Sequence, residues 1–340
     1  MNPYTDVVEN KLHSVVGALS NMKTNSARRR VTPDKDEYPG VDPFIIDQSK
    51  IGVSKVVRRL STRTQVFSDL LNQHIRTRSS HSGEVTLEAV TIAGILGLNI
   101  ELTRAIGMAH DVGHTPFGHE GEQFIAHKSR KPFTHETFGI VILQHVERNG
   151  TGLNLTHEVL SGILRNLVDT KLSEEAKVVM WSDRFAYVTA DYNDIQRVGF
   201  EFPKNLVMAM QRLGDNQRQR MRTLTASLCL ESAEVGSISF CHSETAELFD
   251  EIKQGMYKVY RRVNATNVED ILSPVLAFIK RMFPDSDPYP ILALMTDNDV
   301  LYLASQGVLD YARFQHTTVA ELAPFLSTKK IVWWEPDLSW

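Results

Sequence analysis

Residues 108–122 read Met-Ala-His-Asp-Val-Gly-His-Thr-Pro-Phe-Gly-His-Glu-Gly-Glu. The stretch contains three histidines, one aspartate and two glutamates among small residues and one proline. Such a density of groups that bind metals or transfer protons is unusual for a core segment or a solvated helix face. We interpret the stretch as half of a metal-dependent hydrolase site, for which the rest of the chain supplies further ligands and a substrate pocket.

The sequence that leads into this stretch has a helical pattern. Apolar residues recur at helical spacing over residues 81–96, and Gly97 is a natural stop. Asn99 is a good N-cap for the next helix, which should run to the adjacent His110 and Asp111. Because neighbouring side chains at a helix end can both reach one cavity, this pair is the first candidate for metal ligation.

The histidines of the stretch are separated by helix-breaking residues. Gly113, Pro116 and Gly118 do not support one continuous helix. We therefore expect His114 on a loop and His119 near the start of the following helix.

Helical spacing also dominates the rest of the chain, and the alternation typical of strands is nearly absent. The sequence predicts an all-α fold, an assembly of helices with additional C-terminal helices and little or no β-structure. Residues 31–50 should form a loop, and Gly236–Cys241 is a candidate for a short strand, with an irregular segment as the alternative. Further helices are expected at 119–128, 135–148, 156–168, 173–199, 204–213, 216–234, 244–260, 265–283, 288–304 and 307–326.

Composition excludes several classes of protein. The 340 residues have a net charge of −4, which gives no global reason to expect binding to nucleic acid or a membrane. Only two cysteines are present, so a disulfide framework or a thiolate zinc site is not expected. The N-terminal residues lack the apolar run of a secretory signal, and no apolar stretch is long enough to cross a bilayer. These features predict a cytoplasmic protein that does not enter a membrane.

Two terminal features allow more than one interpretation. The basic run Arg28-Arg29-Arg30 is either a solvated segment or a contact for phosphate or a partner. Trp333 and Trp334 should pack onto the body of the protein or onto a neighbouring subunit. We divide the chain into an N-terminal extension (1–50), a catalytic core (51–235) and a mainly helical C-terminal region packed on the core (236–340).

Two further residues are candidate metal ligands. His81 begins the helix before the central stretch, and Asp183 lies on an otherwise apolar helix. A buried carboxylate is costly unless it is paired or bound to metal, although an ion pair with an arginine would also satisfy Asp183. A lone His81 would more often be structural. Taken together with His110 and Asp111, however, the two residues favour a metal site.

This set of residues resembles the signature of the HD superfamily of metal-dependent phosphohydrolases. Within that superfamily the chain is similar to the deoxyguanosine triphosphate triphosphohydrolases. Family members often have lysine where Arg63 stands and asparagine where Glu136 stands. The segments that carry the resemblance are Arg58-Arg59-Leu60, Thr64-Gln65-Val66-Phe67, Arg76–Ser82, Ala109–Glu122 and Asp183–Tyr187 with Asp191.

The resemblance implies an HD-domain fold and a role for each matching residue. His81, His110, Asp111 and Asp183 would hold a divalent metal ion such as Mg, Mn, Fe, Co or Ni. His119 and Glu122, three positions apart, would be the catalytic pair. The residues that would bind substrate are Gln65, Arg78, His114, Arg184, Tyr187 and Asp191.

The resemblance also implies a reaction. Water would attack the α-phosphorus of a deoxynucleoside triphosphate (dNTP), which would release a deoxynucleoside and inorganic triphosphate. Family members form homo-oligomers, and some use a dNTP or single-stranded DNA as an effector. Two alternatives remain open, namely an HD nucleotidase or phosphodiesterase acting on nucleoside monophosphates or cyclic nucleotides, and a binding module with an inactive site.

Overall fold

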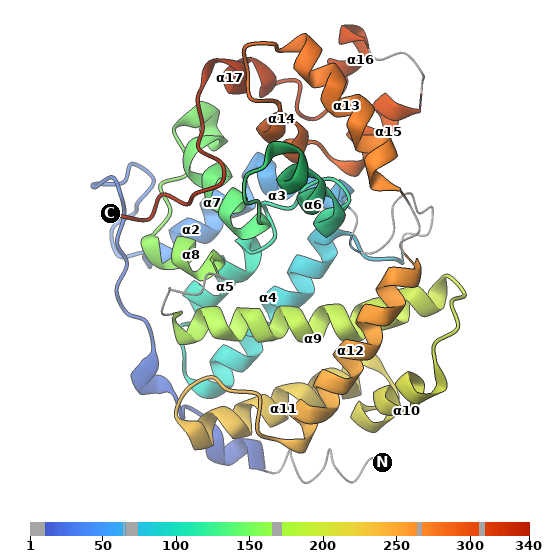
Figure 1. Ribbon diagram of the computed structural model, residues 1–340. Coiled ribbons are helices and arrows are strands. Elements are labelled where there is room, and N and C mark those ends of the chain that lie inside the picture. The colour runs from blue at the N-terminus through green and yellow to red at the C-terminus, as the bar shows by residue number, and fades with distance from the viewer. Residues whose placement is uncertain (1–10, 64, 66–73, 165–171, 264–266, 306–309) are drawn as a thin grey trace. The chain divides into compact units, whose positions relative to one another are not determined.

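A computed structural model describes residues 11–63, 65, 74–164, 172–263, 267–305 and 310–340. Within these ranges the regular elements are helices, and the only β-type pairing is one isolated bridge between Arg29 and Thr156 (Figure 1). The structure therefore confirms the predicted all-α fold. Among the helices of the described ranges, none combines the length and apolar character needed to cross a membrane.

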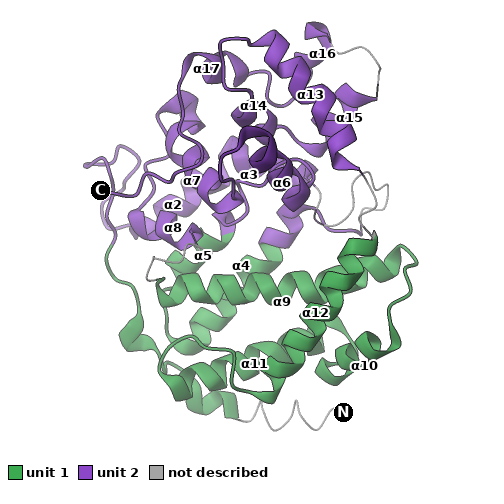
Figure 2. Cartoon of the chain, in the orientation of Figure 1, with its two compact units in different colours: residues 1–26, 83–107, 171–265 green, residues 27–82, 108–170, 266–340 purple. Residues whose placement is uncertain are grey.

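The chain forms two compact units, each assembled from three separate segments (Figure 2). Unit 1 contains residues 1–26, 83–107 and 171–265, and unit 2 contains residues 27–82, 108–170 and 266–340. These units group residues by their contacts, whereas the domains expected from the sequence are consecutive segments of the chain. The expected boundaries near residues 50 and 235 therefore stay a prediction.

Unit 1 is built on the long helix α9 (Glu174–Arg197), which packs against α11 and α12. Its core is apolar, and its aromatic side chains include Phe185, Phe240 and Phe249 in edge-to-face contact. The other helical elements that lie wholly or mainly in unit 1 are η1 (His13–Val15), η2 (Ser20–Met22), α4 (Arg78–Leu96), α5 (Ile100–Ala109), α10 (Lys204–Leu213), α11 (Gln217–Val235) and α12 (Glu244–Val263).

Unit 2 contains the central stretch of the sequence and most of the shorter helices. The helix that follows this stretch, α6, packs against α13 and α14. The elements of unit 2 are α2 (Pro43–Gly52), α3 (Lys55–Arg59), η3 (Leu60–Thr62), α6 (Gly118–Ser129), α7 (His135–His145), η4 (Glu147–Gly150), α8 (His157–Ile163), α13 (Val268–Met282), α14 (Pro288–Leu294), α15 (Asp297–Ala304), α16 (Tyr311–Phe314) and α17 (Ala323–Thr328).

Local signals placed several helix ends correctly. Gly97 ends α4 with a φ of 78°, the left-handed conformation that glycine adopts without strain. The Asn99 side chain then accepts from the backbone N–H of Leu102 at 3.1 Å, as an N-cap does. Helix α6 begins at Gly118. This confirms that His114 precedes the helix and that His119 lies near its start.

The predicted loop at residues 31–50 is partly wrong, because α2 already begins at Pro43. Asp42 accepts from the backbone N–H of Phe44 at 2.8 Å and so caps this helix. Proline at the first helical position has no N–H to leave unsatisfied, which suits it to start the helix. In this segment the Asp42-Pro43 pair marks the start of a helix rather than a loop.

The two C-terminal helices predicted at 288–304 and 307–326 are both interrupted. The first divides into α14 and α15 because Thr296 and Asp299 form a capping box that starts a new helix. In the second, residues 306–309 lie outside the described ranges, and only α16 and α17 are helical. Pro324 lies in the first turn of α17 and marks its beginning.

The strand proposed at Gly236–Cys241 is not formed. Instead the carboxylate of Glu231, on α11, accepts from the backbone N–H groups of Cys241 at 2.6 Å, His242 at 3.2 Å and Ser243 at 3.1 Å. These donors hold the pKa of Glu231 below its usual value although burial would raise it. A carboxylate on α11 therefore satisfies these backbone N–H groups, which need no neighbouring strand.

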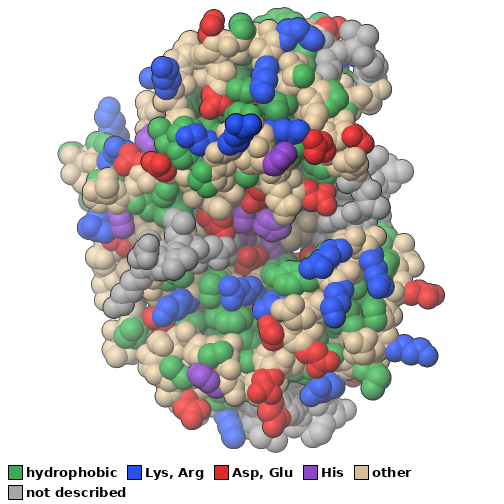
Figure 3. Space-filling model, in the orientation of Figure 1, with side chains coloured by type: hydrophobic (Ala, Val, Ile, Leu, Met, Phe, Trp, Pro, Cys, Tyr) green, Lys and Arg blue, Asp and Glu red, His purple; other side chains and the backbone are tan. Residues whose placement is uncertain are grey.

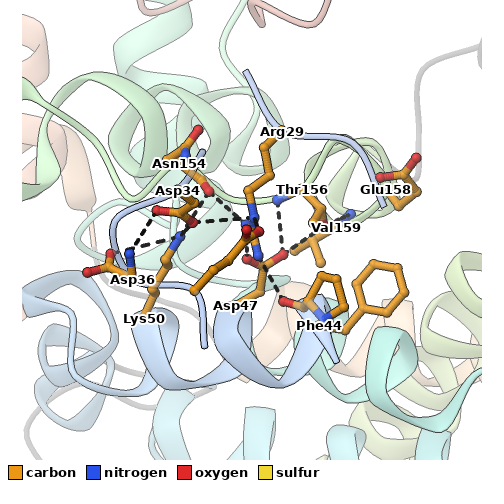
Figure 4. A network of polar contacts seen from close by, with 12 residues as sticks. Arg29, Asp34, Asp36, Phe44, Asp47, Lys50, Asn154, Thr156, Glu158 and Val159 are labelled. Atoms are coloured by element: carbon orange, nitrogen blue, oxygen red, sulfur yellow. Dashed lines mark hydrogen bonds and ion pairs between the residues drawn. The ribbon is translucent and has the colours of Figure 1, made fainter. Parts of the chain in front are cut away.

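The basic run at residues 28–30 is bound within unit 2. Arg28 pairs with Glu158 at 3.3 Å and Arg30 pairs with Asp337 at 2.6 Å. Arg29 is buried and lies in a polar network with Asp47, which it contacts at 2.5 Å (Figure 4). The network also includes Asp34, Lys50, Asn154 and Thr156. These three arginines thus tie the start of unit 2 to its later segments.

We predict that Arg29 is important for stability and that Arg30 is not. Replacing Arg29 with leucine leaves the buried Asp47 without its charge partner, which should reduce the free energy of unfolding by about 3–5 kcal/mol. The matched change Arg30→Leu removes an exposed pair and should cost about 0–1 kcal/mol. Urea unfolding measures both values. Equal losses in the two variants would contradict the structural role of the network.

The tryptophans near the C-terminus pack onto unit 2 itself. Trp333 is buried, and its indole N–H donates to Asp287 at 2.7 Å. Lys131 lies over the ring of Trp334, 4.4 Å from its centroid. On the face drawn in Figure 3 acidic and basic side chains are interspersed, which agrees with the small net charge of −4.

Candidate metal and hydrolytic site

Three of the four predicted metal ligands converge in unit 2. His81 lies in the first turn of α4, and His110 and Asp111 follow the end of α5. The rings of His81 and His110 are 5.9 Å apart, and Nε2 of His110 lies 3.2 Å from Oδ1 of Asp111. All three side chains are buried.

These residues fit a divalent metal ion. One ligand atom from each of His81, His110 and Asp111 lies within 4.8 Å of the others. Two imidazole nitrogens and a carboxylate oxygen are donors that suit first-row transition metals. Burying these polar side chains together costs free energy unless a cation binds them. The donor set and its close approach therefore support a metal centre.

Arg78 enters this group from the first residue of α4. Its Nη1 donates to Oδ2 of Asp111 at 3.0 Å, and the side chain is buried. Burial would raise the pKa of Asp111, but His110, His114 and Arg78 together hold it well below its usual range. Asp111 is therefore ionised, as a metal ligand must be.

A second cluster is centred on one oxygen of Glu122, on α6. Its Oε1 lies 2.8 Å from Nδ1 of His114, 3.0 Å from Nδ1 of His135 and 3.4 Å from Nδ1 of His119. The predicted His119–Glu122 approach is thus present, but two other histidines lie closer to the carboxylate. The side chain of His119 is 70% exposed, whereas His114 and His135 are buried.

The two buried histidines have opposite protonation states. Burial, together with the positive charges of Arg78 and His135, lowers the pKa of His114 to about 4. Burial would also lower the pKa of His135, but Glu122 and Glu136 outweigh it and raise the value to about 9. At neutral pH a charged His135 therefore lies against a neutral His114.

The geometry of this cluster favours hydrogen bonding over a second metal ion. The rings of His114 and His135 are stacked, with centroids 3.8 Å apart and planes 15° from parallel. A nitrogen lone pair lies in the plane of its ring, so one ion cannot lie in the planes of two stacked rings. A proton shared between His135 and Glu122 requires no such alignment.

Gly113 makes this arrangement possible. A Cβ atom at Gly113 would lie 1.9 Å from the carbonyl oxygen of His135 and 2.3 Å from the backbone nitrogen of Gly139. The loop therefore approaches α7 more closely than any other residue would allow. This close approach sets His135 against His114.

Four of the remaining predicted residues of the site lie on α9 in unit 1. Asp183 is half-buried there, so the proposal that it completes the metal site with three residues of unit 2 stays a prediction. Tyr187 shares a hydrogen bond of 3.1 Å with Tyr257, and Asp191 accepts one of 2.8 Å from Tyr260. Tyr187 and Asp191, four positions apart, thus lie on one face of α9 and meet the same face of α12.

The last two residues predicted to bind substrate, Arg184 and Gln65, have different surroundings. Arg184 lies over the ring of Trp181, with its Cζ 4.8 Å from the centroid. Gln65 is half-buried, and its Oε1 atom is buried without a hydrogen-bond partner among the described residues. A buried amide oxygen in this state is available to a ligand.

Comparison with known proteins bears on this site. Residues 78–188 match the family model described as HD domain. The chain carries an HD domain. The matched range begins at Arg78 and includes His81, the His110-Asp111 pair and Asp183. All four predicted metal ligands therefore fall inside the HD domain.

Curated relatives extend the similarity beyond the HD domain. The chain is 36% identical over 234 residues to a deoxyguanosinetriphosphate triphosphohydrolase-like protein of Clostridium tetani, covering 64% of this chain and 66% of the relative. A protein with the same description from Caldanaerobacter subterraneus subsp. tengcongensis is 37% identical over 233 residues, covering 67% and 66%. Another, from Clostridium perfringens, is 38% identical over 226 residues, covering 64% and 65%. The chain thus spans about two thirds of the length of these relatives or slightly less.

Sequence reasoning missed three residues that the structure places beside predicted ones. His135 lies within the HD domain, and its Nδ1 is 3.0 Å from Oε1 of Glu122. Tyr257 and Tyr260 lie outside the HD domain on α12. Their spacing of three residues on a helix was the available signal, because it puts both rings on one face.

Proposed function

We propose that the protein is a metal-dependent phosphohydrolase that converts a dNTP into a deoxynucleoside and inorganic triphosphate. The observation that carries the proposal is the buried convergence of His81, His110 and Asp111 inside the HD domain. The relatives, which are described as deoxyguanosinetriphosphate triphosphohydrolase-like, support the substrate class. The oligomeric state and the effector remain predictions.

The metal ligands in this proposal are His81, His110, Asp111 and Asp183. The ion that they hold would supply Lewis acidity at the reacting phosphate. Ionised Asp111 and its partner Arg78 keep the negative charge of the site compensated before substrate arrives. Arg78 and Arg184 would then bind phosphate oxygens, which suits the planar guanidinium group.

Proton transfer is assigned to His119 and Glu122. The exposed ring of His119 is accessible to water, and the nearby carboxylate of Glu122 stabilises the imidazolium that forms when His119 accepts a proton. Burial would raise the pKa of Glu122, but His135 and His114 hold it well below its usual range. Glu122 therefore stays ionised throughout, and His114 in its neutral form can contact the triphosphate.

A hydrolysis panel tests the proposed function. The full chain is incubated with each of the four dNTPs and with Mg²⁺, Mn²⁺ or Co²⁺, and products are separated by chromatography. We expect a deoxynucleoside and inorganic triphosphate in equal amounts, because water attacks the α-phosphorus. Release of orthophosphate or pyrophosphate instead would indicate attack at another phosphorus. Absence of product with every dNTP and metal would reject the proposal.

Tyr187 is predicted to exclude ribonucleotides. A ring placed beneath the sugar leaves little room for a 2′-hydroxyl, so Tyr187→Ala should reduce the preference for dNTPs over NTPs by about tenfold or more. The control Tyr187→Phe keeps the ring and loses only the hydrogen bond to Tyr257. The ratio of kcat/KM values for a dNTP and its NTP measures the effect. An unchanged ratio in Tyr187→Ala would remove Tyr187 from this role.

A further inference from the structure

The turn that introduces the catalytic helix has an unfavourable backbone conformation. Phe117 has a φ of 60° and Gly118 has a φ of 55°, so two successive residues are left-handed. This conformation is costly for a phenylalanine, and it persists only where surrounding structure supports it. Helix α6 begins directly after Phe117, so the turn sets the direction from which His119 and Glu122 project.

The support comes from a residue far away in sequence. The backbone N–H of Phe117 donates to Oδ1 of Asp297 at 3.0 Å. Asp297 is 2% exposed and is the first residue of α15, outside the HD domain. Phe117 supplies no side-chain cap to α6. A carboxylate in this place both satisfies the N–H group and is favoured by the positive end of the helix dipole.

Asp297 is itself held in place. The capping box of Thr296 and Asp299 fixes the start of α15 around it. Just before it in the chain, the carbonyl groups of Ala293 and Met295 accept from Nη2 of buried Arg63 at 3.0 and 3.1 Å. The carboxylate of Asp297 is therefore presented from a rigid junction rather than from a loose side chain.

The other side of the turn contacts the predicted metal site. A Cβ atom at Gly118 would lie 2.7 Å from Nη2 of Arg78, whose Nη1 donates to Asp111 at 3.0 Å. The turn therefore lies between Asp297 and the Arg78–Asp111 pair. A shift of the turn would change the distance between the proton-transfer pair and Asp111.

We propose that Asp297 is a positioning residue that holds the Phe117–Gly118 turn and so aligns His119 and Glu122 with the metal site. This inference rests on the proposed function for its effect on catalysis, whereas the hydrogen bond to Phe117 is independent of any reaction. Asp297 acts through the backbone of the turn, because its carboxylate accepts from the N–H of Phe117.

The test combines kinetics with hydrogen–deuterium exchange. In Asp297→Ala we expect faster exchange at the Phe117 amide and a fall in kcat of about 10- to 100-fold, the usual result of a small displacement of catalytic groups. KM and bound metal should change little, because the three ligands in unit 2 precede the turn. Asp297→Asn keeps an acceptor oxygen and should restore slow exchange and most of kcat.

The control is Asp310→Ala, which removes the N-cap of helix α16, another short C-terminal helix, and leaves both Asp297 and the capping box around it unchanged. It should lower stability while leaving kcat and the Phe117 exchange rate near those of the original protein. Unchanged exchange and kcat in Asp297→Ala, or an equal loss of kcat in Asp310→Ala, would overturn the proposal. If the original protein hydrolyses no dNTP, the proposed function fails, and the exchange rates still decide whether Asp297 holds the turn.

Discussion

Replacing His110 with alanine should abolish both metal binding and turnover. His110 is fully buried, and it contributes one of the three donors that meet in unit 2. Loss of one donor from such a set weakens binding of a divalent ion strongly, because the remaining ligands no longer complete its coordination. Metal content is measured by mass spectrometry after dialysis, and turnover is measured by release of deoxynucleoside.

His119→Ala should have a different effect. This side chain is 70% exposed, its Nδ1 lies 3.4 Å from Oε1 of Glu122, and it is not one of the three donors. The variant should retain its metal and lose about 10²- to 10⁴-fold in kcat, the usual contribution of a general acid or base. The matched control is His127→Ala, an exposed histidine on the same helix α6. Loss of metal in His119→Ala, or full activity in it, would contradict the division of roles.

Gly113→Ala should be one of the most damaging single changes in unit 2. The added methyl group would lie 1.9 Å from the carbonyl oxygen of His135, so α7 or the loop must move. Overpacking of this kind costs on the order of 1–3 kcal/mol or more. Because the movement separates His135 from His114, turnover should fall even when the measurement is corrected for unfolded protein.

The control for this change is Gly83→Ala in helix α4. A Cβ atom at Gly83 meets nothing within 4 Å, and the residue is exposed. Alanine is favoured over glycine in a helix by about 0.8–1 kcal/mol, so this variant should be slightly stabilised. Thermal unfolding compares the two variants. A Gly113→Ala protein as stable and active as Gly83→Ala would show that the close approach of loop and helix is not required.

Elements that depend on nearby residues were predicted well, and those that depend on distant residues were not. Periodicity and caps act within a few residues, so α10 was predicted at 204–213 and occurs at Lys204–Leu213. The helix predicted at 307–326 is interrupted in the described residues, and Gly236–Cys241 forms the irregular segment rather than the strand. In the second case the decisive group was the carboxylate of Glu231 on α11, and a pattern of neighbouring residues does not reveal such a partner.

The same distinction applies to the candidate site. The density of histidines and carboxylates in residues 108–122 indicated metal binding or proton transfer. The resemblance to the HD superfamily then implied that His119 and Glu122 form the proton-transfer pair. The approach of His119 to Glu122 followed from helical geometry, because residues three apart share a face. Their roles as ligands and as a proton-transfer pair remain predictions that the variants above test.

The sequence by itself determined the helical class of this protein, most helix ends and the types of residue available for chemistry, because each depends on interactions between near neighbours. The tertiary structure alone decided which of those residues meet. It brought His135 onto Glu122 through the close approach at Gly113, and it placed Asp297 on the N–H of Phe117 from 180 positions away. Contacts between distant segments depend on how helices pack as a whole, and local spacing carries no information about that packing.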